Sequence, residues 1–109
     1  MTTVTFHTEE GRIVGFESTG HSGYAEEGED IVCAAITSTI RLVATTVNDV
    51  LGLAASVKVN EETTTISLRL PGGLSEADEN VCQVLLTGLM VFFTELRDEY
   101  PDNIEILEG

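Results

Sequence analysis

The stretch DIVCAAITSTIRLVATTVNDVLG, residues 30–52, decides how this chain folds. Its aliphatic residues recur at spacings of three and four, which is the pattern of an amphipathic helix. The members of this stripe are Val32, Ile36, Ile40, Val43, Val47 and Leu51. Asp30 is a favourable N-cap residue and Gly52 a favourable stop, so we expect the helix to lie between them. A helix with a single apolar stripe has to pack on a sheet or on another helix.

The segments on both sides of this helix predict two β-hairpins. Apolar residues alternate with polar ones around two polar turns, 8–11 and 60–63. The alternating residues are Val4, Phe6, Val14 and Phe16 in the first hairpin, and Val57, Val59, Ile66, Leu68 and Leu70 in the second. Pro71-Gly72-Gly73 then closes the second hairpin.

A second helix follows the second hairpin. Ser75, with Asp78 three residues later, resembles a capping box and predicts the start of this helix. Pro101 predicts its end. Apolar residues at helical spacing between these limits are Val81, Leu85, Leu89, Phe92 and Leu96. The alternation in residues 103–107 then predicts a short final strand.

The element order is therefore ββαββαβ. Because strands and helices do not alternate strictly, this order indicates an α+β fold, with a mostly antiparallel sheet and two helices packed on one face. A chain of 109 residues is long enough for one hydrophobic core. We expect one domain over residues 1–109.

The composition is strongly acidic, with 19 Asp and Glu against 5 Lys and Arg and a formal net charge of −14. Direct binding to nucleic acid is not expected, because phosphate contacts need Lys and Arg. The charge suits a basic partner, although it also explains solubility by itself.

The sequence also bears on where the protein works. We see no run long enough to span a bilayer and no basic and apolar start typical of a signal peptide, so we expect no membrane contact and a cytoplasmic location. The two cysteines would then stay reduced. No Gly-rich phosphate loop and no Cys or His pair at metal-ligand spacing is present, so no metal or other cofactor is predicted.

The loop before the first helix carries the candidate chemistry. If Asp30 caps the helix, Cys33 lies in the first turn, where the helix dipole favours a thiolate. His21 titrates near neutral pH and lies in a loop punctuated by glycines, so it could fold back toward Cys33. Asp30 could instead orient His21, and one carboxylate cannot easily do both. Cys82 has the helical spacing of a core residue.

Two blocks in this region resemble those of the ribosomal-processing cysteine proteases known as Prp. The first is Gly20-His21, and the second is Gly28-Glu29-Asp30-Ile31-Val32-Cys33-Ala34-Ala35. The element order and the chain length agree with this family as well, so the resemblance covers essentially the whole chain.

The resemblance implies a concrete function. Members of the family are bacterial cytosolic endopeptidases that remove a short N-terminal extension from large-subunit ribosomal protein L twenty-seven, cutting after a pair of aromatic residues. They use a Cys/His dyad, need no metal and are homodimers. By matching motif positions, His21 is the dyad histidine, Cys33 is the nucleophile, and Asp30 has a supporting role.

The same match implies a set of substrate-binding residues. These are Gly20, Ser22, Gly23, Tyr24 and Thr37. Ser22 stands where the family commonly has Ala, and Thr37 where it commonly has Ser. Tyr24 either packs against the aromatic residues of the substrate or anchors the loop to the core.

A protein of a different functional class remains an alternative. This alternative is a non-enzymatic acidic adaptor that binds a basic ribosomal protein during ribosome assembly.

Overall fold

Five strands and two long helices make up the part of the chain that the computed structural model describes. This part comprises residues 1–20 and 27–109, with the backbone alone described for residues 27–30. The elements are β1 (Thr2–Glu9), β2 (Arg12–Thr19), α1 (Glu27–Thr45), η1 (Thr46–Val50), β3 (Ser56–Asn60), β4 (Thr65–Arg69), α2 (Glu76–Glu99) and β5 (Ile104–Glu108). The element η1 is a π-helical turn that continues α1. The predicted order ββαββαβ is confirmed.

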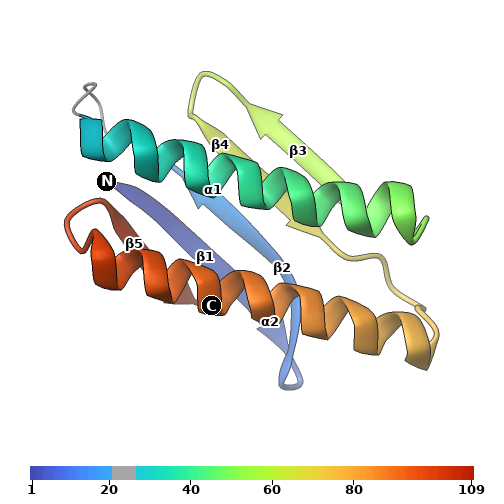
Figure 1. Ribbon diagram of the computed structural model, residues 1–109. Helices are drawn as coiled ribbons and strands as arrows, with labels where there is room; N and C mark the ends of the chain where they lie inside the picture. Colours follow the sequence, from blue (N-terminus) through green and yellow to red (C-terminus); the bar gives the residue numbers. More distant parts are fainter. Residues whose placement is uncertain (21–26) are drawn as a thin grey trace.

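The strands form one sheet in the order β3-β4-β2-β1-β5. All neighbouring pairs are antiparallel except β1 and β5, which are parallel. Both helices lie side by side on the same face of the sheet and run in opposite directions (Figure 1). The α+β fold, with a mostly antiparallel sheet and two helices on one face, is therefore as predicted.

The turn of the first hairpin is tighter than the sequence predicted. Glu10 and Gly11 both have positive φ, 52° and 77°, as the two central residues of a type I′ turn do. Thr8 and Glu9 still pair with β2, because the register between the strands shifts after His7. The turn therefore has two residues between the strands instead of the four predicted.

The core lies between the sheet and the helix layer. Val4, Phe6 and Phe16 point from the sheet toward the helices and are completely buried. The Phe6 ring lies 6.0 Å from that of Phe16 and 6.2 Å from that of Phe93 on α2, between ring centroids. From α1 and η1 the predicted stripe is buried, except that Leu51 is half-buried. These contacts fix both helices on the sheet.

The buried face of α2 is rotated from the one that the sequence predicted. The predicted stripe included Val81, but this side chain is 45 % exposed, and Leu85 and Phe92 are half-buried. The buried residues are Cys82, Leu86, Leu89, Phe93 and Leu96. The helix is apolar over most of its circumference, so spacing alone did not identify the face that packs on the sheet.

Helix α1 begins at Glu27, so the prediction that Asp30 is its N-cap is wrong. Three of the four residues from 27 to 30 are acidic. Acidic residues stabilise the N-terminal turn of a helix, which explains why the helix begins before its apolar stripe.

For α2 the capping prediction is confirmed, because the Ser75 hydroxyl accepts a hydrogen bond from the Asp78 backbone N–H at 3.1 Å.

Two helical segments are long and apolar enough to span a membrane by length and composition, Ile31–Val50 and Glu76–Glu99. Our expectation that no run reaches this length is therefore wrong. A core helix of a soluble protein passes the same test, and both segments contribute side chains to the core under the sheet.

The side chain of Gln83 joins α2 to β2. Its amide oxygen accepts a hydrogen bond from the Ile13 N–H and its amide nitrogen donates to the Ile13 carbonyl, both at 2.8 Å. Gln83→Leu keeps the volume but leaves both backbone groups without these partners, so we expect it to lower the free energy of unfolding by about 1–3 kcal/mol, measured by urea denaturation. Glu95→Gln, an exposed change on the same helix, should stay within about 0.5 kcal/mol. Equal stability of the two variants would contradict the role of Gln83.

Candidate active site

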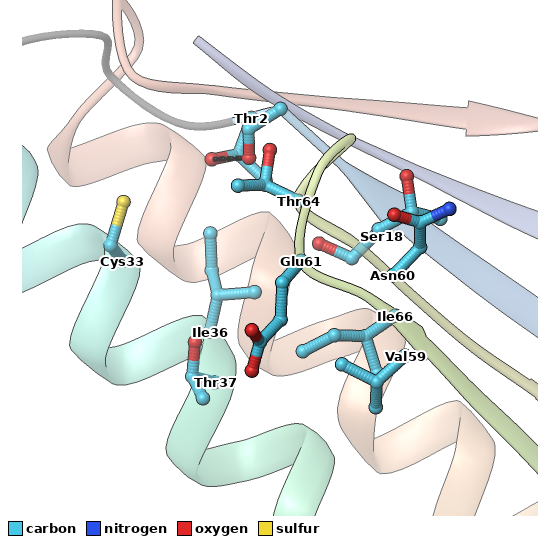
Figure 2. Close-up of a pocket in the computed structure, with 12 residues that line it drawn as sticks. Thr2, Ser18, Cys33, Ile36, Thr37, Val59, Asn60, Glu61, Thr64 and Ile66 are labelled. Carbon is cyan, nitrogen blue, oxygen red and sulfur yellow. Dashed lines mark hydrogen bonds between the residues drawn. The ribbon is translucent and has the colours of Figure 1, made fainter.

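Cys33 opens onto a pocket between α1 and the end of the sheet. The side chain is half-buried, and the pocket has a volume of about 280 Å³. Ile36 and Thr37, the residues one turn further along α1, line the same pocket, as Figure 2 shows. Residues three and four positions apart share one face of a helix, so the sequence places all three side chains together.

The other walls come from the sheet. Thr2 and Ser18 stand at the ends of β1 and β2, and both are buried although they are polar. Val59 and Ile66 from β3 and β4 add an apolar wall. Among the described lining residues, Glu61 contributes the one charged side chain. The pocket is therefore largely apolar, with hydroxyl groups on one side and a carboxylate at its rim.

The turn that carries Glu61 is held by hydrogen bonds. The Asn60 side-chain oxygen accepts from the backbone N–H groups of Glu62 and Thr63, at 3.0 and 3.2 Å. The Thr65 hydroxyl lies 3.0 Å from that of Thr19 on β2. Local bonds of the Asn60 kind, from a side chain to nearby backbone groups, fix a turn in one conformation. One wall of the pocket is therefore ordered before any ligand binds.

Three of the predicted site residues meet at this pocket: Gly20, Cys33 and Thr37. Gly20 has a φ of 83°, and a Cβ atom there would lie 2.9 Å from the Met1 carbonyl oxygen. Both observations explain why glycine stands at this position. His21, Ser22, Gly23 and Tyr24 lie outside the described residues, as does the side chain of Asp30.

The early start of α1 changes the environment predicted for Cys33. Cys33 lies six residues after Glu27, so it is beyond the first helical turn. The effect of the helix dipole falls off within that turn, and the N–H groups left unpaired at a helix start belong to its first four residues. The dipole argument for a thiolate at Cys33 is therefore wrong in this geometry, although the position facing the pocket remains.

Cys82 differs from Cys33 in its exposure and does not line the pocket. It is completely buried in α2, as predicted for a core residue. Burial raises the pKa of its thiol, and the carboxylates of Glu79 and Asp78 raise it further. The Cys82 sulfur is thus held in the protonated, unreactive form at neutral pH. Neither cysteine is in a disulfide.

Within residues 1–20 and 27–109, no group of three or more His, Cys, Asp or Glu side chains is arranged to hold a metal ion. The described pocket offers the Cys33 sulfur and the hydroxyl and carboxylate groups around it.

The sequence reasoning missed Thr2, Ser18 and the turn that follows β3. Thr2 and Ser18 stand at apolar-phase positions of their strands, and that exception to the alternation was the available signal. The turn lies about thirty residues after Cys33 in the chain, and no local pattern indicates that it reaches the pocket.

A thiol on a helix that faces a pocket is placed as the nucleophile of a thiol hydrolase would be. The chain belongs to the cysteine protease Prp family, because the model of that family, described as Cysteine protease Prp, matches residues 1–105. The activity that follows from this membership is that of a cysteine protease.

Individual relatives agree with this assignment. The chain is 28 % identical over 94 residues to the ribosomal processing cysteine protease Prp of Bacillus subtilis, covering 86 % of this chain and 84 % of that protein. It matches the essential ribosomal processing protease Prp from S. aureus, solved in complex with a substrate peptide, with a TM-score of 0.85, 18 % identity and full coverage of both chains. SMU.848 from Streptococcus mutans matches with a TM-score of 0.85 and 25 % identity, over 100 % of this chain and 96 % of that one.

The contrast between the two cysteines can be tested by alkylation. We expect iodoacetamide near neutral pH to modify Cys33 more than about tenfold faster than Cys82, because only an opening of the core exposes Cys82. Peptide mass spectrometry after timed quenching measures both rates. Equal rates, or faster modification of Cys82, would contradict the described placement of the thiols.

Proposed function

We propose that this cysteine protease removes the N-terminal extension of large-subunit ribosomal protein L twenty-seven in the cytoplasm, with Cys33 as nucleophile and His21 as its dyad partner. The observation that carries the proposal is the position of Cys33 on the pocket between α1 and the turn after β3. The name of the Bacillus subtilis relative, a ribosomal processing protease, supports the class of substrate.

The dyad assignment rests on chain order at the pocket. Gly20 lines the pocket and His21 follows it directly in the sequence. In the proposed mechanism the Cys33 sulfur attacks the scissile carbonyl carbon, and His21, which holds the thiol proton, gives it to the leaving amine. The resulting thioester is hydrolysed by a water molecule, which His21 deprotonates, and the acid product leaves.

Asp30 and Thr37 take supporting roles in this proposal. Since α1 begins at Glu27, Asp30 is not needed as a cap, and this favours its other candidate role of orienting His21. Thr37 lies one helical turn after Cys33 and lines the same pocket, so its hydroxyl is placed to bind the substrate near the scissile bond.

The lining of the pocket suits the proposed substrate. Ile36, Val59 and Ile66 offer an apolar wall for the aromatic residues that precede the cleavage site. The Glu61 carboxylate at the rim and the net charge of −14 would attract a basic ribosomal protein.

The proposal predicts that Cys33→Ala gives a folded protein with no detectable cleavage. The substrate is the ribosomal protein with its extension, and the product is measured by intact-mass spectrometry. Cys82→Ala removes a buried thiol, so it should lower stability by about 1 kcal/mol and leave cleavage intact. An intact substrate after incubation with the wild-type protein would instead support the acidic adaptor.

The outer face of the helix layer supports a homodimer, which we propose as the working form. Residues 80–94 contain no charged residue and residues 31–48 contain one, Arg41, although the whole chain carries −14. Exposed apolar side chains on this face are Ile31, Leu42, Val81, Val84 and Val91. An apolar hollow of about 380 Å³ between the helices is lined by Thr46, Asn80, Val81, Val84 and Leu85. Two copies that meet here would bring few like charges together.

A charge placed in this hollow tests the dimer. Val84 is 75 % exposed, so Val84→Glu should preserve the fold while weakening the dimer at least about tenfold, measured by analytical ultracentrifugation. Leu107→Glu adds the same charge on the opposite face of the sheet, where Leu107 pairs with Thr5, and should leave the dimer unchanged. A dimer that survives Val84→Glu would place the interface elsewhere.

A further inference from the structure

Ser18 is an exception to the rule that buried polar groups have partners. Its side chain is 6 % exposed, and it stands on the face of β2 that packs toward the helices. Among the described residues, the Ser18 hydroxyl has no hydrogen-bond partner. The nearby Thr2, which is equally buried, donates its hydroxyl proton to the Gly20 carbonyl at 3.4 Å. A buried hydroxyl without a partner costs free energy, so its presence needs a reason.

The position of Ser18 supplies that reason, because the residue lines the same pocket as Cys33 (Figure 2). Ser18 pairs with Val4 on β1 and with Ile66 on β4, so neighbouring strands hold its backbone on both sides. A side chain on a strand inside a sheet has a fixed direction. The hydroxyl is therefore presented rigidly to whatever fills the pocket.

We infer that the Ser18 hydroxyl hydrogen-bonds the main chain of the peptide substrate and positions it for attack by Cys33. This inference rests on the proposed protease function. A peptide amide has both a donor N–H and an acceptor C=O, and a serine hydroxyl can pair with either. The peptide would supply the hydrogen-bond partner that the Ser18 hydroxyl lacks among residues 1–20 and 27–109, so binding would recover free energy that burial of the hydroxyl cost. Ser18 is a positioning residue and takes no part in bond making.

This role predicts opposite effects of one substitution on stability and on binding. Ser18→Ala removes a hydroxyl that has no partner in the described part of the chain, so the melting temperature should stay the same or rise. The same variant should bind peptide about fivefold more weakly, because the substrate loses one hydrogen bond. A purely structural serine would show the reverse: lower stability with unchanged affinity.

The affinity is measured in a Cys33→Ala background, so that the peptide is not consumed. The probe is a fluorescein-labelled peptide of the ribosomal-protein extension that spans the cleavage site, titrated by fluorescence anisotropy. Ser67→Ala is the matched control, because Ser67 lies on β4 opposite Glu17, on the other face of the sheet, and should not change the affinity. Ser18→Thr keeps the hydroxyl and should retain more affinity than Ser18→Ala.

The outcomes separate this inference from the proposed function. Equal affinities for Ser18→Ala and for its parent, or no advantage of Ser18→Thr over Ser18→Ala, would overturn the role of Ser18 while cleavage by the wild-type protein continues. A wild-type protein that neither binds nor cuts the peptide would overturn the proposed function and this inference together. If Ser18→Ala does not fold, the hydroxyl is structural and the inference is overturned as well.

Discussion

The contact of Phe6 with Phe16 on one side and Phe93 on the other is the interaction on which the rest of the structure depends. It joins the neighbouring strands β1 and β2 to α2, and α1 packs beside α2 on the same face. Because both helices cover one face of the sheet, nearly all apolar burial is concentrated in a single layer. The pocket lies where this layer ends, at Thr2 and Ser18, and Cys33 lines it one helical turn before Ile36, a member of the apolar stripe of α1. The site thus lies at the edge of the hydrophobic core.

Much of this fold follows from local patterns in the sequence. Alternation located all five strands, and helical spacing located both long helices, because each pattern reports on one face of one element. The patterns gave wrong predictions where the local sequence was compatible with more than one helix start or more than one buried face. Asp30 satisfies the rule for a cap, yet the acidic residues before it extend α1 to Glu27. The apolar surface of α2 is so wide that the sheet, and not the spacing, decides that Leu86 and Phe93 are buried while Val81 is exposed.

Part of the candidate site was also predictable, because some of its residues are close together in the sequence. Cys33 and Thr37 share one face of a helix, and Gly20 adjoins the candidate histidine in sequence, so short-range arguments identified them. Ser18 and the turn around Glu61 reach the pocket through strand pairing over distances of tens of residues, which no local pattern encodes. The apolar character of both long helices has a related explanation. Their outer faces carry few charges, and a second copy of this chain would cover such a face as well as lipid would.

The parallel pairing of β1 with β5 joins the first strand of the chain to the last one, Ile104–Glu108. Such a contact joins residues about a hundred positions apart, and contacts of large sequence separation slow folding. A ribosome makes β5 after the other four strands. Until β5 is made, one edge of β1 has no partner strand while β2 pairs with the other edge, and the amide groups of the open edge can pair with another extended chain.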